Sequence, residues 1–302
     1  MIDKKKILER KKEDSPTDFI LPLRRLFKQD LDAIILYGSW LRGQRNTLLD
    51  FYVLKRNRRN TENMISNLAC RVLPPNVYVL KLDRKSGSDR MAKYSTMTLR
   101  SLERHVDKDF HPYFWARFCQ PALLIWARDL ATKDNVDRIF AHARYRMLKE
   151  NLPLLMENFD SNVFWRQALT HTYSCELRSE RPEKITEIVE SNRLYLEKTL
   201  SEFRRKESFL IASASDAAAS TNSVVRLLFR LRRRTQRNWG KLLSLTRLVK
   251  AAFTFNNALE YVLWKIERHS GIQETPSELQ CRYPLLFAWP LLWKIYQKGG
   301  FK

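Results

Sequence analysis

The sequence predicts an α+β protein in which a small mixed sheet with flanking helices precedes a mostly helical part. Three short apolar runs, residues 33–37, 51–54 and 77–82, have the length and composition of strands. Downstream of these runs, the apolar residues recur at helical spacing. We therefore expect a sheet-containing domain over residues 1–130 and a helical domain over residues 131–302.

The individual elements follow in order along the chain. Apolar side chains within residues 19–26 are spaced for one face of a first helix. A fourth strand is expected near residues 91–94, after a Ser-Gly-Ser-Asp turn. The remaining segments are expected to be helical: residues 62–73, 99–106, 113–118, 121–128 and 137–157, two helices within 162–204, and most of 222–302.

The composition describes a folded and very basic chain. Its 302 residues are 44% hydrophobic and 12% aromatic, which is enough to build a core. The formal net charge of +22 predicts a polyanionic partner, either nucleic acid, an anionic bilayer or a phosphate-bearing substrate. No apolar run reaches the ~18 residues of a membrane span. With no signal peptide visible and four widely separated cysteines, we expect a cytoplasmic protein that is peripheral on a membrane.

The candidate nucleotide site begins where the first expected strand ends. Gly38 and Ser39 follow that strand, and Asp50 opens the next one. A small turn lets backbone N–H groups and a hydroxyl approach a triphosphate, while a neighbouring carboxylate can hold the Mg²⁺ that bridges the phosphates. This order is typical of nucleotidyltransferases, although Gly-Ser is also a common turn dipeptide. Tyr52 stands where those enzymes usually have a second Asp, so the second carboxylate comes from elsewhere or the site is degenerate.

Three further segments extend this motif. The pattern comprises Tyr37-Gly38-Ser39 with Gln44 and Asp50-Phe51, then Lys93-Tyr94, then Tyr113-Phe114-Trp115-Ala116-Arg117-Phe118-Cys119-Gln120-Pro121, and finally Tyr173-Ser174-Cys175-Glu176-Leu177-Arg178. In this order it resembles the mitochondrial-type phosphatidate cytidylyltransferases, the translocator assembly and maintenance family, across roughly residues 30–200. That family also lacks the second Asp. The chain departs from it at Trp40 and Gln120, where the family has Gly and Lys.

The resemblance implies the reaction CTP + phosphatidate → CDP-diacylglycerol + pyrophosphate. The phosphate monoester oxygen of the lipid would attack the α-phosphorus of CTP, with Mg²⁺ and cationic side chains neutralising charge. Asp50 is then the expected Mg²⁺ ligand. Glu176 is the candidate for the second carboxylate, and Asp83 at the end of the third strand competes with it.

The same resemblance assigns the groups that would bind phosphate. Gly38, Ser39 and Lys93 are expected to hold the triphosphate. Arg117 and Arg178 would bind the triphosphate or the lipid phosphate, where a planar guanidinium is better suited than an ammonium. The simpler alternatives are a surface charge for Arg117, a solvated Lys93, and an exposed ion pair of Glu176 with Arg178.

The last third of the chain indicates which molecule accepts the nucleotide. Residues 224–250 alternate arginine and lysine with leucine, which is typical of basic amphipathic helices on an anionic bilayer, and residues 238–240 are expected to break them. Residues 283–296 have the Trp and Tyr content of an interfacial anchor, or else their aromatic side chains pack into the core of the helical domain.

Two other functions use the same features. A nucleotidyltransferase acting on RNA or another acceptor needs the same charge, but large aliphatic residues separate the basic ones and no RNA-binding motif is recognisable. The third hypothesis is a catalytically inactive scaffold that keeps the fold and the membrane-binding surface.

Overall fold

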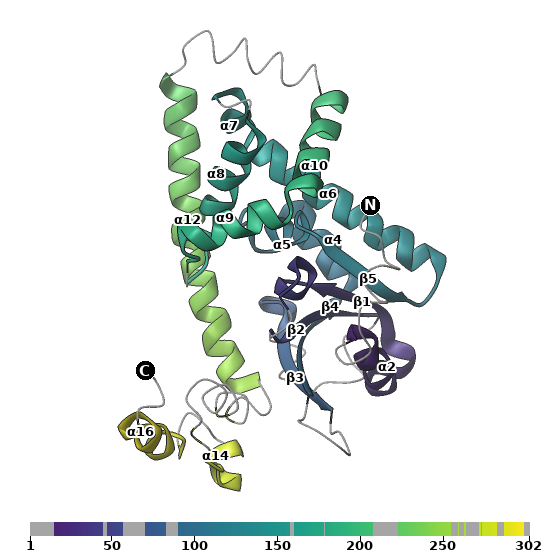
Figure 1. The fold of residues 1–302 in the computed structure, drawn as a ribbon, viewed down its shortest axis with the longest axis vertical. Helices are drawn as coiled ribbons and strands as arrows, with labels where there is room; N and C mark the ends of the chain where they lie inside the picture. The colour runs from purple at the N-terminus through teal and green to yellow at the C-terminus, as the bar shows by residue number, and fades with distance from the viewer. Residues whose placement is uncertain are drawn as a thin grey trace.

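A computed structural model describes most of the chain and confirms the α+β class. The described residues are 15–44, 47–56, 70–82, 90–157, 160–177, 179–207, 223–254, 274–282 and 287–298, with single positions 259, 263 and 272. Among them, five strands form one mixed sheet in the order β3-β4-β2-β1-β5 (Figure 1). These strands are β1 (Leu31–Tyr37), β2 (Leu49–Lys55), β3 (Asn76–Leu82), β4 (Arg90–Thr98) and β5 (Ala122–Ala127).

The strand register places polar residues from three strands in one row. Strand β1 is antiparallel to β2, and β2 is parallel to β4. Tyr37 pairs with Asp50, and Asp50 pairs with Lys93. Because directly paired residues project from the same face of a sheet, these three side chains share one face near the end of β1.

The helix expected over residues 121–128 is wrong, because this segment forms the edge strand β5. It runs antiparallel to β1, with Leu123 opposite Leu36 and Leu124 opposite Ile35. Leu123 belongs to the hydrophobic cluster on one face of the sheet and Leu124 to the cluster on the other. Only an extended chain sends consecutive residues to opposite faces, so burial on both sides selects a strand for this uniformly apolar run.

Helices cover both faces of the sheet. Helix α2 (Ile20–Phe27) buries Leu23 and Phe27 against one face. On the other face lie α4 (Leu99–Lys108), α5 (Tyr113–Phe118) and α6 (Leu130–Glu150). The cluster on that face combines Tyr52 of the sheet with Leu169 and Leu200 of later helices, so the sheet and the helices beyond residue 130 share one core.

Two asparagines divide the helical part more finely than expected. One helix was expected over residues 137–157, but there are two: α6 ends before Asn151, and α7 (Leu152–Glu157) begins after it. The region of two expected helices contains three, α8 (Ser161–Ser174), α9 (Pro182–Ser191) and α10 (Arg193–Lys206), with Asn192 between the last two. In both breaks the asparagine Nδ2 donates to the carbonyl four residues earlier, which satisfies an orphan acceptor at the helix end.

The long basic segment is one helix, α12 (Ser223–Thr254), so the break expected at 238–240 is wrong. Gly240 does not interrupt it but is buried, because a Cβ there would collide with the Cys175 carbonyl oxygen and the His111 ring. Its missing side chain lets α12 pack closely against α8 (Figure 1). The chain ends in the short helices α14 (Glu278–Arg282) and α16 (Trp289–Gln297). No helix in the described part of the chain has the length and hydropathy to cross a bilayer.

Substituting Gly240 by alanine is expected to destabilise the protein, although the same change in an exposed helix stabilises it by about 0.5–1 kcal/mol. The added methyl group meets backbone and a buried ring, and such overpacking costs about 1–3 kcal/mol. Urea unfolding of Gly240→Ala against the exposed control Lys241→Ala measures the difference. A more stable Gly240→Ala protein would contradict this packing.

Two buried histidines lie at the same interface. Burial, followed by the charge of Arg247, lowers the pKa of His111 to about 4. Burial and then Arg233 lower the pKa of His171 to about 4, and its Nε2 lies 2.9 Å from Gln236 Oε1 of α12. Both imidazoles are therefore neutral at pH 7 and dock α12 without adding charge.

These shifts predict acid-sensitive stability. Each histidine titrates near 6.5 when unfolded and near 4 when folded, so its contribution is complete above pH 6.5 and is lost as the pH falls toward 4. The free energy of unfolding should fall by roughly 1.4 kcal/mol per pH unit for each histidine in that window. His171→Gln should halve this slope, and the exposed control His142→Gln should not. An unchanged slope in His171→Gln would refute the assignment.

Candidate active site

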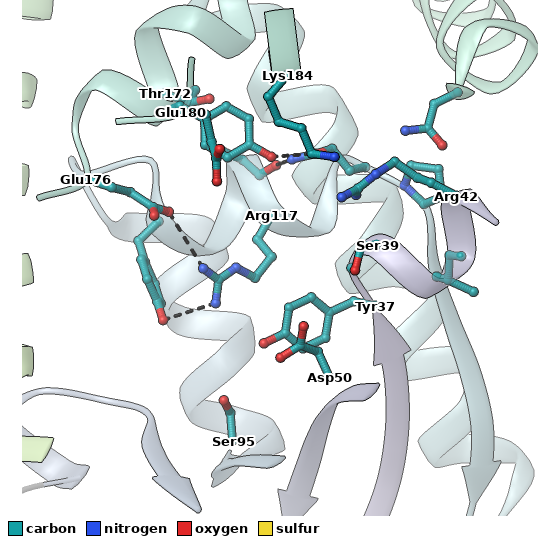
Figure 2. Close-up of a pocket in the computed structure, with 18 of the residues that line it drawn as sticks. Tyr37, Ser39, Arg42, Asp50, Ser95, Arg117, Thr172, Glu176, Glu180 and Lys184 are labelled. Atoms are coloured by element: carbon teal, nitrogen blue, oxygen red, sulfur yellow. Dashed lines mark hydrogen bonds and ion pairs between the residues drawn. The ribbon is translucent and has the colours of Figure 1, made fainter. Parts of the chain in front are cut away.

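A cavity of about 480 Å³ lies at the end of the sheet where β1 stops, between the sheet and the helices α5, α8 and α9. Six of the seven site residues expected from the sequence line it: Gly38, Ser39, Asp50, Lys93, Arg117 and Glu176. The other, Arg178, lies outside the described residues, as does Asp83. Figure 2 shows Arg117 near the middle of this cavity, with Asp50 and Ser39 to one side and Glu176 to the other.

The turn after β1 requires glycine for two reasons. Gly38 has φ +92° and ψ −158°, a backbone conformation that is essentially restricted to glycine. A Cβ at this position would also lie 3.1 Å from Asp50 Oδ2. The short 3₁₀ helix η3 (Ser39–Arg42) follows, and Gly43 ends it with φ +88°. The Gly38 turn therefore brings its backbone close to the Asp50 carboxylate, and Ser39 after it lines the same cavity.

Asp50 is paired with a lysine from the neighbouring strand. Lys93 Nζ lies 2.8 Å from Asp50 Oδ1, and both side chains are partly exposed to the cavity. Burial acts to lower the pKa of Lys93, but Tyr37 and the Asp50 carboxylate outweigh it and raise that pKa. Burial, then Asp50, raises the pKa of Tyr37 to about 12. The pair is thus a fixed carboxylate and ammonium, flanked by a neutral phenol.

Arg117 is held by phenols from the sheet and from its own helix. Its Nη1 donates to the hydroxyls of Tyr52 and Tyr113, each at 3.0 Å. Its guanidinium carbon lies 4.3 Å from the Tyr113 ring centroid and 5.4 Å from that of Tyr37. Burial would lower the pKa of Arg117, but these phenols and Glu176 raise it well above its usual value. The guanidinium therefore stays charged at the centre of the cavity.

Tyr52 explains the missing second Asp of the motif. It is fully buried on the same face as Asp50, two residues along β2, and its hydroxyl accepts the hydrogen bond from Arg117. A carboxylate at this position would project into the sheet core. In this chain the residue at position 52 therefore orients the Arg117 guanidinium.

Glu176 enters the cavity from the end of α8. Its Oε1 lies 3.6 Å from Arg117 Nη2, which places a carboxylate on the far side of the guanidinium from Tyr52. Nearby, the Tyr173 hydroxyl donates to Gln120 Oε1 at 3.3 Å. The third and fourth segments of the sequence pattern thus meet through side-chain contacts.

Several lining residues were not anticipated from the sequence. Arg42 of η3 and Lys184 of α9 add two cations, and Glu180 adds a carboxylate (Figure 2). Arg42 could have been anticipated from the sequence, because it lies on the same short segment after the turn as Ser39. Lys184 could not have been anticipated, because only the fold brings α9 to the cavity.

Helix α12 contacts residues that form the cavity wall and the start of β3. Arg247 lies 4.0 Å from the Tyr113 ring centroid, and its Nε donates to the Pro74 carbonyl at 3.2 Å. Lys250 Nζ donates to the Leu73 and Pro75 carbonyls at 2.5 and 2.6 Å. Arg117 and Arg247 outweigh burial and lower the pKa of Tyr113. Helix α12 therefore contacts both β3 and the ring that orients Arg117.

The chemistry available in the cavity suits phosphates rather than a protein-built metal centre. The lining has the cations Arg42, Lys93, Arg117 and Lys184 and the carboxylates Asp50, Glu176 and Glu180. In the described part of the chain, no three His, Cys, Asp or Glu residues gather into a group that could hold a metal ion. Any metal here would depend on the ligand for much of its coordination.

Comparisons with models of known protein families and with curated proteins return no match for this chain.

The two glycines of the turn offer a matched test of its geometry. Gly43→Ala is expected to cost about 1–2 kcal/mol of stability, because its positive φ strains an alanine while nothing lies within 4 Å of the added Cβ. Gly38→Ala should cost more, because it also presses on Asp50 in a conformation that only glycine tolerates. Urea unfolding of both variants measures the difference. Equal losses would show that the contact with Asp50 is unimportant.

Proposed function

We propose that this protein is a CTP:phosphatidate cytidylyltransferase that makes CDP-diacylglycerol and pyrophosphate at a membrane surface. The observation that carries the proposal is the convergence of the four sequence segments on one cavity. Gly38, Lys93, Arg117 and Glu176 come from positions spread over about 140 residues, yet all line it. The choice of CTP and of a lipid acceptor rests on the resemblance of those segments to the cytidylyltransferase family.

The cavity offers separate contacts for the two phosphate-bearing substrates. The Gly38 turn lies beside Asp50 and Ser39 lines the same cavity, so both suit the triphosphate of a nucleotide. Arg117 presents a rigid guanidinium toward the cavity centre, where a phosphate monoester and an α-phosphate could both reach it. Arg42 of η3 and Lys184 of α9 add charge for the outgoing pyrophosphate.

Magnesium fits this donor set when the nucleotide supplies much of its coordination. In nucleotide sites Mg²⁺ takes one or two carboxylates together with phosphate oxygens and water. Asp50, with Oδ2 facing the Gly38 turn, would be the first carboxylate. Glu176 is the second candidate within the described residues. A bound Mg²⁺ would neutralise charge on the triphosphate.

The protein's own groups account for the remaining steps. The phosphate oxygen of phosphatidate attacks the α-phosphorus, the bond to the bridging oxygen breaks, and pyrophosphate leaves. Arg117, fixed by Tyr52 and Tyr113, stabilises the negative charge on the transferring group without moving. Lys93 holds Asp50 in place until the nucleotide binds. Positioning and charge neutralisation supply the rate enhancement.

Surfaces on the C-terminal helices support an acceptor in a bilayer. On α16, Trp289, Trp293 and Tyr296 are 67%, 62% and 60% exposed, whereas Leu291 and Ile295 are buried. These three aromatic side chains therefore do not fill a core, and their spacing puts them on one face. Along α12, exposed leucines alternate with arginines. Both features suit peripheral binding to an anionic membrane.

The proposed reaction predicts that the purified protein, given CTP and Mg²⁺, converts phosphatidate in mixed micelles to CDP-diacylglycerol. Asp50→Asn and Ser39→Ala should each lower kcat/KM by about 10²-fold or more, because the first removes the proposed Mg²⁺ ligand and the second a hydroxyl that would contact the triphosphate. Asp137→Asn on α6 and Ser201→Ala on α10 are matched exposed controls that should leave the rate unchanged. Thin-layer chromatography of the labelled lipid measures the product.

The other outcomes separate the competing functions. Transfer of the nucleotide to RNA instead of lipid would refute the proposed acceptor. A folded protein without turnover of any nucleotide would favour the inactive scaffold, in which Lys93 permanently neutralises Asp50.

A further inference from the structure

A second cavity, of about 780 Å³, lies between α8 and α12. Helix α8 presents Tyr173 to the candidate active site, but Arg166, Thr170 and Ser174 line this other cavity. These three positions repeat every four residues, so they form one stripe along α8. The cavity is therefore separate from the site already described.

Arginine dominates this cavity. It is lined by five arginines: Arg166 from α8, and Arg230, Arg233, Arg234 and Arg237 from α12. We name this cavity the arginine groove. The four α12 positions have the spacing i, i+3, i+4 and i+7, so they face α8 together. Within the described residues that line the groove, none is acidic.

Another arginine of α12, outside the groove, does have a carboxylate partner. On another face of the same helix, Arg232 pairs with Glu150, with Nη2 to Oε2 at 2.7 Å. Guanidinium groups on facing helices repel one another when they lie within a Debye length, about 8 Å at physiological salt. Such a concentration of like charge destabilises the ligand-free groove and is relieved by a bound anion.

The groove also has a structured floor. Arg233 is partly buried, its Nη2 donates to the Gln167 carbonyl at 3.2 Å, and its guanidinium lies 5.2 Å from the Phe229 ring centroid. The Thr170 and Ser174 hydroxyls donate to carbonyls of their own helix, so they leave ligand recognition to the arginines. His171 is neutral at pH 7 and adds no charge.

We propose that the arginine groove binds a phosphate-bearing anion of at least two negative charges. Several guanidinium forks on two facing helices match the tetrahedral oxygens of a phosphate monoester or of pyrophosphate. The source is either the headgroup phosphate of a lipid such as phosphatidate or a soluble oligophosphate. This binding is independent of the reaction proposed for the other cavity.

The test compares a groove variant with a matched charge control. The groove variant is Arg166→Gln/Arg237→Gln, which removes two exposed arginines from opposite walls. The control is Arg205→Gln/Lys241→Gln, which removes two exposed charges from α10 and α12 outside the groove. Both variants keep the candidate active site intact, so any difference between them reports on the groove.

Two probes distinguish the sources of the phosphate. Isothermal titration calorimetry with inorganic pyrophosphate measures a soluble ligand. Sedimentation with phosphatidylcholine vesicles that contain phosphatidate measures a lipid headgroup, and vesicles with phosphatidylserine provide the same lipid surface without a phosphate monoester. For the true ligand, the groove variant should bind at least about tenfold more weakly than the control, because charge-assisted hydrogen bonds are lost.

A second variant guards against an effect on folding. Thr170→Glu places a carboxylate at an exposed position inside the groove, where it competes for the arginines without removing any of them. It should weaken the same probe while leaving the melting temperature unchanged or higher.

Each outcome decides the proposal. Weaker binding of pyrophosphate in both groove variants supports a soluble oligophosphate, and weaker binding of phosphatidate vesicles alone supports a lipid headgroup. If both probes bind the groove variant and the control equally, the groove is not a phosphate site. This result would leave the cytidylyltransferase assay unaffected, so the two proposals fail separately.

Discussion

The partly buried guanidinium of Arg117 is the constraint on which the arrangement of the site depends. A cation in a protein interior is unfavourable unless hydrogen bonds and opposite charge surround it. Here Tyr52 of the sheet and Tyr113 of α5 accept its hydrogen bonds, while Glu176 at the end of α8 supplies the charge. Satisfying this one cation therefore fixes the sheet, α5 and α8 relative to one another around the cavity.

Helix α12 extends this arrangement. The guanidinium of Arg247 also contacts the Tyr113 ring, which Arg117 contacts as well. Gly240 permits the close approach of the helix to α8. The basic residues along α12 have different partners. Arg247 and Lys250 bind backbone carbonyls beside β3, Arg232 pairs with a carboxylate, and the four arginines toward α8 face a groove whose described lining has no acidic residue. A sequence that is uniformly basic in composition thus forms distinct surfaces.

The sequence predicted the fold class and the first four strands, because apolar runs and turn chemistry are local signals. That Lys93, Arg117 and Glu176 belong with Asp50 was implied only by the family resemblance, and all four line one cavity. It failed where tertiary contacts decide. Residues 122–127 are apolar throughout and suit either structure, and only burial on both sheet faces makes them a strand. Gly240 reads as a helix breaker, although its function is to admit the Cys175 carbonyl. Lys184 and the pairing of Tyr52 with Arg117 depend on contacts between distant segments, which no local pattern encodes.

The central claim is that one cavity, built around Arg117, holds the nucleotide and its metal. A crystal structure with Mg²⁺ and a non-hydrolysable CTP analogue tests this most directly. We expect the triphosphate to lie against the Gly38 turn and Ser39, the metal to contact Asp50, and Arg117 to contact the α-phosphate. A triphosphate bound elsewhere, in the arginine groove for example, with the Lys93–Asp50 pair intact, would contradict it.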